Sequence, residues 1–146
     1  MEYVKSYKEL EVCKLARELS KEIFGLSRGF PNGEMYSLTD QVRRSSLSIR
    51  AQIAEAWGKR LYKNHFVSKL TDADSEQLET QHWIETALDC LYISDEIADG
   101  LSQRYASVGK MLNSMISKSE SFCGKVITKD NESNHHANTR LLNTTH

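Results

Sequence analysis

Cationic side chains gather in one part of the sequence, at a density typical of a site for a phosphate backbone. Residues 42–71 carry seven cations and a single acid, Glu55, and so a net charge of +6. The cations are Arg43, Arg44, Arg50, Lys59, Arg60, Lys63 and Lys69. Each phosphate that such a side chain neutralises releases counterions, so affinity is expected to fall as salt rises. These seven are the candidate nucleic-acid-binding residues, and Tyr62 and Phe66 among them are expected to stack on unpaired bases.

Acidic side chains gather in the segment that follows. Residues 72–99 carry nine acids and no Lys or Arg, and the whole chain has 19 basic and 20 acidic residues. A net charge of −1 excludes a histone-like polycation, but the separation of charge makes the molecule an electric dipole. Basic and acidic faces of neighbouring copies can also contact each other and fix the register of an assembly. RNA contact and a purely structural role therefore both remain open.

Catalytic and metal-binding patterns are weak. The sequence holds no H-E-x-x-H motif and no phosphate-cradling glycine loop. Glu79 and His82 form the Glu-x-x-His unit of di-iron bundles, which requires a second such pair. The other Glu-x-x-His unit, Glu132 and His135, falls in a polar tail. We therefore expect no enzymatic activity, no metal or other cofactor and no small-molecule substrate, with a di-iron site as a minor alternative.

Cysteine usage and hydropathy favour a cytoplasmic protein. Cys13, Cys90 and Cys123 show no C-x-x-C spacing, so we expect reduced thiols, with Cys13 and Cys90 in the core. No apolar run approaches the ~20 residues that cross a bilayer, and the first ten residues hold no apolar signal region. No membrane contact is expected.

Apolar residues recur at helical spacing in four stretches, which predicts an all-α, up-and-down antiparallel four-helix bundle. The first helix is expected over residues 7–25 after a Ser6–Glu9 capping box, and the second over 37–58, capped by Ser37. The third is long, with a stripe at Phe66, Leu70, Ala73, Leu78, Ile84, Leu88 and Leu91. The fourth begins after Ser94 and ends near residue 123. The bundle domain is predicted to be residues 1–123, followed by a disordered tail, 124–146.

Two glycines interrupt the fourth predicted helix. Gly100 and Gly109 each cost ~1 kcal/mol relative to alanine inside a helix. The sequence therefore predicts that another part of the backbone or core approaches closely at both positions.

Several segments carry a resemblance to a known family. The most specific is Tyr-x-Leu-x-Asp-Gln-Val-Arg-Arg at 36–44, followed by Ile-Ala-Glu at 53–55. Matching segments also lie at 7–12, 29–31, 48–49, 78–81 and 108–113. In order and spacing, the chain from residue 7 to 116 resembles the bacterial four-helix-bundle proteins encoded in intervening sequences of 23S ribosomal RNA genes.

The resemblance implies a bundle that assembles into a homopentameric ring, has no known enzymatic activity and is linked to ribosomal RNA or the ribosome. Only Arg43 and Arg44 match the family's paired arginines, and a structural ion-pair role is equally open for them. Arg50 stands where the family usually has proline, which predicts a straighter second helix with one more charge. A more distant resemblance, to the accessory protein of diversity-generating retroelements, implies an alternative partnership with nucleic acid and a reverse transcriptase.

Together these observations predict a non-enzymatic pentamer whose five basic segments bind ribosomal RNA with avidity. The alternative is an assembly scaffold that binds a protein partner and no RNA.

Overall fold

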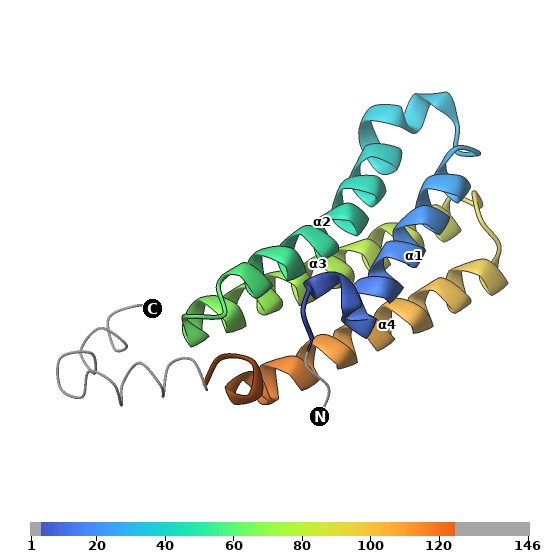
Figure 1. The fold of residues 1–146 in the computed structure, drawn as a ribbon. Coiled ribbons are helices and arrows are strands. Elements are labelled where there is room, and N and C mark those ends of the chain that lie inside the picture. Colours follow the sequence, from blue (N-terminus) through green and yellow to red (C-terminus); the bar gives the residue numbers. More distant parts are fainter. Residues whose placement is uncertain (1–3, 125–146) are drawn as a thin grey trace, which may run out of the picture.

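The structure is a computed structural model that describes residues 4–124. Its four long helices alternate in direction, and each packs against two neighbours: α1 against α2 and α4, and α3 against α2 and α4 (Figure 1). Residues 4–124 contain no strand. The predicted up-and-down bundle is therefore confirmed, while the predicted tail lies outside the described residues apart from Gly124. The bounds are α1 Glu11–Ser27, α2 Asp40–Gly58, α3 Lys63–Asp89 and α4 Asp95–Ser117, with short turns η1 Tyr7–Glu9, η2 Asn32–Glu34, η3 Met35–Thr39 and η4 Glu120–Gly124.

The first capping signal serves a short turn rather than the long helix. Ser6 Oγ accepts a hydrogen bond from the Lys8 N–H at 3.2 Å, and Glu9 Oε1 accepts one from the Lys5 N–H at 3.2 Å. These bonds stabilise η1, after which Leu10 is extended (φ −67°, ψ 135°) and buried. The predicted start of the first helix at residue 7 is thus wrong, and α1 begins at Glu11.

The second capping signal also acts differently from its prediction. Ser37 caps no helix, because its hydroxyl donates to Glu34 Oε1 at 2.6 Å. The Tyr92 hydroxyl donates to Glu34 Oε2 at 2.7 Å, and the Tyr92 ring lies 5.4 Å from that of Phe30. These two hydrogen bonds lower the pKa of Glu34, and its carboxylate raises the pKa of Tyr92 to about 12. Glu34 thereby fastens the α3–α4 connection to the α1–α2 loop.

Polar residues occupy two core positions of α3. Gln77 and Thr80 are buried, whereas Leu78 is 57% exposed and Leu91 is 86% exposed, contrary to the predicted apolar stripe. The buried positions of α3 follow steps of four and three, namely Phe66, Leu70, Ala73, Gln77, Thr80, Ile84 and Ala87. A stripe traced through apolar residues alone misses part of this buried face, because Gln77 and Thr80 can be buried once their polar groups are hydrogen-bonded. The Thr80 and Ser45 hydroxyls lie 2.8 Å apart, and Gln77 Nε2 donates to Asp74 Oδ1 at 2.9 Å.

The cysteines divide between core and surface. Cys13 and Cys123 are buried, and burial raises the pKa of the Cys123 thiol to about 11. Cys90 is exposed, which corrects the expectation of a core position, because it follows the last residue of α3. In the part of the chain that the structure describes, no helix is both long and apolar enough to span a bilayer.

Only one of the two glycines in α4 lies in a close contact. A Cβ at Gly109 would lie 2.7 Å from Gln77 Nε2 and 3.1 Å from Asp74 Oδ1, whereas a Cβ at Gly100 would meet nothing within 4 Å. The predicted close packing is therefore confirmed at Gly109 and wrong at Gly100 within one protomer.

This difference predicts opposite effects of alanine at the two positions. Gly100→Ala should raise the free energy of unfolding by about 0.5–1 kcal/mol through helix propensity. Gly109→Ala gains the same propensity but displaces the buried Gln77 amide from its hydrogen bonds, a loss of about 1–3 kcal/mol. Urea unfolding at one protomer concentration should place Gly109→Ala at least about 1 kcal/mol below Gly100→Ala. Equal shifts of the two variants would contradict the contact at Gly109.

Candidate nucleic-acid interface

The seven predicted residues do not form one positive end. Arg44, Lys63 and Lys69 each have carboxylate partners within the protomer. Arg44 lies 3.6 Å from Glu76 and also contacts Glu79, and Lys63 contacts Glu120. Lys69 Nζ lies 3.1 Å from Glu55 and 4.0 Å from Asp72. Such partly exposed pairs stabilise the fold by only ~0–1 kcal/mol each, but their carboxylates offset the positive charge of three predicted cations.

The α2–α3 hairpin keeps Lys59 and Arg60 without a carboxylate partner among residues 4–124. The Arg60 guanidinium lies over the Trp57 ring, 3.6 Å from its centre. Phe66 is fully buried in the core, which corrects the expectation that it stacks on bases. Tyr62 is half-buried, with its ring 5.7 Å from that of His65. The hairpin therefore presents a smaller positive surface than the sequence predicts.

The Glu79–His82 pair is engaged in protein contacts. Glu79 Oε2 accepts a hydrogen bond from the Trp83 indole at 3.0 Å and contacts Arg44. The indole and then the guanidinium lower the pKa of Glu79. The His82 ring lies 4.6 Å from the Trp83 ring. Residues 4–124 contain no group of three or more metal-binding side chains, and Glu132 and His135 lie outside them.

One serine has the spacing of a hydrolase nucleophile motif. Gly25, Ser27 and Gly29 form Gly-x-Ser-x-Gly, but Ser27 lies in the last turn of α1 and is buried. Its hydroxyl donates to the Phe24 carbonyl at 3.2 Å and accepts from Arg43 Nε at 2.7 Å. A nucleophile elbow needs an exposed serine on a turn between a strand and a helix, so Ser27 has a structural role.

Arg43 and Arg50 instead face α1, where a longer cationic surface runs between the two helices. α1 carries Lys14, Arg17 and Lys21, and Arg28 directly follows its last residue. Their steps of three, four and seven residues place them on one face. The α1–α2 strip is defined as these four residues with Lys8, Arg43 and Arg50. Among residues 4–124, Lys14 is the one member with a carboxylate partner, Glu11 at 3.4 Å. From Lys14 to Arg28 the strip is about 21 Å long at 1.5 Å per residue.

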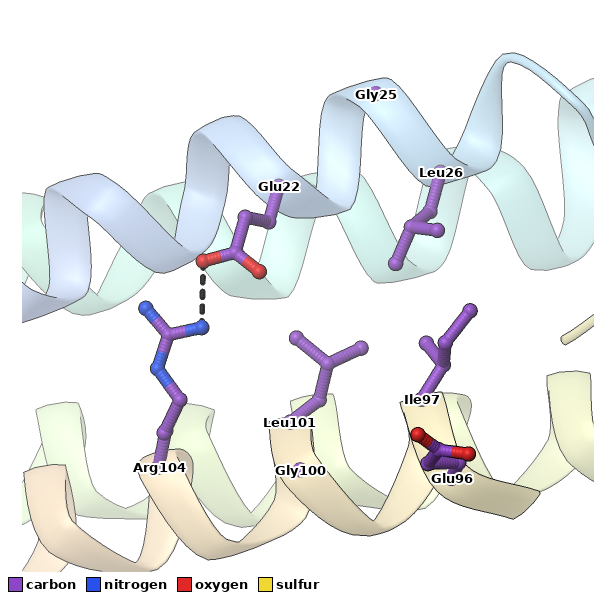
Figure 2. A pocket seen from close by; sticks show the side chains of 8 residues that line it. All are labelled: Glu22, Gly25, Leu26, Glu96, Ile97, Gly100, Leu101 and Arg104. Carbon is purple, nitrogen blue, oxygen red and sulfur yellow. Dashed lines mark ion pairs between the residues drawn. The ribbon is translucent and has the colours of Figure 1, made fainter. Parts of the chain in front are cut away.

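The acids of α1 lie toward its other neighbour. Glu18 and Glu22 pair with Arg104 of α4 at 3.1 and 2.6 Å. Figure 2 shows the Glu22–Arg104 pair. Glu22 and Arg104 border an open hollow of about 480 Å³ between α1 and α4, whose apolar wall includes Leu26 and Ile97. α1 thus carries its cations toward α2 and two of its acids toward α4.

Segment totals hide this arrangement, because residues 1–41 hold six basic and seven acidic residues. The segment totals therefore miss five strip residues, namely Lys8, Lys14, Arg17, Lys21 and Arg28. The signal that could have found the last four is their helical spacing.

The strip lies along two adjoining hollows. The first, of about 250 Å³, is lined by Lys8, Cys13, Lys14, Arg17 and Arg50. The second, of about 390 Å³, includes Lys21, Phe24, Arg28 and Leu47 together with Arg17 and Arg50, which line both. The Arg43 guanidinium lies 4.9 Å from the centre of the Phe24 ring. The strip thus combines an open cationic trough with an apolar floor, a surface suited to an extended polyanion.

Comparison with known proteins agrees with this fold. The chain is similar to a crystal structure of a protein with unknown function from the S23 ribosomal protein family of Bacteroides thetaiotaomicron. The TM-score is 0.66 at 28% identity, over 73% of this chain and 95% of that one. No curated protein matches. The family model of the 23S rRNA-intervening sequence protein matches residues 8–114, and the chain therefore belongs to this family.

Proposed function

We propose that the protein is a non-enzymatic, oligomeric RNA-binding bundle that contacts ribosomal RNA through the α1–α2 strip. The observation that carries this proposal is the row of seven cations along one helix pair, of which Lys14 alone has a carboxylate partner among residues 4–124. The family's description names 23S rRNA, which supports ribosomal RNA as the polyanion. Lys59 and Arg60 at the hairpin provide a second, smaller contact.

Assembly is part of the proposal. One strip offers a small number of phosphate contacts, whereas five copies in a ring multiply them without any new contact within the protomer. Exposed Leu91 and Ile97 and the hollow between α1 and α4 supply apolar surface for such an assembly. We propose a homopentamer that acts in the cytoplasm.

The direct test is a titration of a labelled fragment of 23S rRNA with the wild-type protein at 50 and 200 mM salt. We expect saturable binding whose log Kd rises with log salt by about 0.7–0.9 for each phosphate neutralised. Protein purified without nuclease should carry ribonuclease-sensitive absorbance at 260 nm. Absence of binding at 50 mM salt would overturn the proposal.

A protein scaffold is the second candidate. It is favoured by the exposed acids near the α3–α4 connection, Glu85, Asp89, Asp95 and Asp99, which have no cationic partner among residues 4–124. In this alternative the strip of one copy contacts the acidic end of another. Sedimentation would then show that the assembly dissociates into protomers at high salt. The same sample would bind neither ribosomal RNA nor a reverse-transcriptase complex.

A further inference from the structure

Arg50 holds a buried donor that the protein leaves unused. Its Nε has no hydrogen-bond partner within residues 4–124, although the atom is shielded from solvent. A buried donor without a partner is unfavourable, and the Arg50 side chain that carries it also lines a hollow at the surface. The position is on α2, facing the N-terminal half of α1.

The hollow beside Arg50 is cationic on several sides. Lys8 comes from η1, Lys14 and Arg17 come from α1, and Arg50 comes from α2. Among residues 4–124 no carboxylate lines the hollow, although Glu11 pairs with Lys14 at 3.4 Å, and Cys13 completes the wall. It is less open than the adjoining hollow, so charge-assisted hydrogen bonds there are less weakened by solvent.

We propose that this hollow, the Arg50 pocket, binds a multiply charged phosphate group, either a phosphomonoester or a pyrophosphate. A phosphodiester carries one negative charge, whereas a monoester or pyrophosphate carries about two or more near neutral pH and matches several converging cations. The planar Arg50 guanidinium anchors the group, since its fixed donors suit phosphate oxygens. Lys8, Lys14 and Arg17 complete the charge.

The location relates the pocket to the proposed function. It adjoins the open trough through Arg17 and Arg50, so a strand that lies along the strip would bring its terminal phosphate to the pocket. A free nucleotide or pyrophosphate would supply the same group. The inference that an RNA end supplies the phosphate rests on the proposed function, whereas the inference of a phosphate pocket does not.

Pyrophosphate is the first probe, measured by isothermal titration at constant ionic strength. Wild-type protein is compared with Arg50→Gln, Arg50→Lys and, as a matched control outside the pocket, Lys21→Gln. We expect saturable binding that Arg50→Gln weakens about tenfold or more, that Arg50→Lys restores in part, and that Lys21→Gln leaves within about twofold. Circular dichroism verifies that each variant is folded. An equal loss in Arg50→Gln and Lys21→Gln, or no wild-type binding, would overturn the pocket.

A second pair of probes separates the sources of the phosphate. Short RNAs of one sequence carry either a 5′-phosphate or a 5′-hydroxyl. Tighter binding of the phosphorylated RNA that disappears in Arg50→Gln assigns the pocket to an RNA end. Equal binding of both RNAs, with pyrophosphate still bound, assigns it to a free phosphate ligand. Pyrophosphate binding without any RNA binding would keep the pocket and overturn only the proposed function.

Discussion

Replacing Arg17, Lys21 and Arg28 together by glutamine should weaken RNA binding at least about tenfold at physiological salt. Three cations of the α1–α2 strip are then lost per protomer, and each is expected to neutralise one phosphate. The slope of log affinity against log salt should fall in magnitude by about 2–3 units. Fluorescence polarisation of a labelled 23S rRNA fragment between 50 and 200 mM salt measures both quantities.

The matched control is the triple change of Lys59, Lys63 and Lys69 to glutamine. It removes the same charge, but Lys63 and Lys69 have carboxylate partners in the folded protein. We expect it to alter affinity by no more than about threefold and the slope by about one unit, from Lys59. If the hairpin triple weakened binding and the α1 triple did not, the interface would lie on residues 42–71, where the linear charge count places it.

The sequence predicts the number of helices and their order well, because helical periodicity and capping residues are local features. It predicts the ends less well. The Ser6 and Ser37 signals are present, yet their hydrogen bonds serve neighbouring turns. The core face of α3 is also misplaced, since Gln77 and Thr80 become buried only once partners on nearby turns and on α2 are available.

The candidate interface could be predicted only in part, for a related reason. A charge total over a segment ignores which face of a helix each residue occupies, and α1 separates its cations from two of its acids. Such a total also cannot show ion pairs between residues that are far apart in the sequence, such as Lys63 and Glu120. Arg43 and Arg50 remain in the candidate interface because both face α1.

Phe66→Ala should cause a large loss of stability, about 3–5 kcal/mol of the free energy of unfolding, the usual cost of emptying a buried phenylalanine site. Phe66 is fully buried, and its ring lies 5.6 Å from that of Phe122, which in turn lies 6.4 Å from the Trp57 ring. These aromatic contacts join α2, α3 and η4. Urea unfolding at a fixed protomer concentration measures the loss.

Tyr62→Ala is the control, because Tyr62 belongs to the same hairpin but is only half-buried. Its expected cost is about 1 kcal/mol. Under conditions in which both variants are folded, Phe66→Ala should retain wild-type RNA affinity, since a ring enclosed by the core cannot reach a base. If a folded Phe66→Ala protein lost RNA affinity, the hypothesis that Phe66 stacks on bases at the hairpin would be supported again. The phosphate contacts of the α1–α2 strip would then not be enough to account for binding.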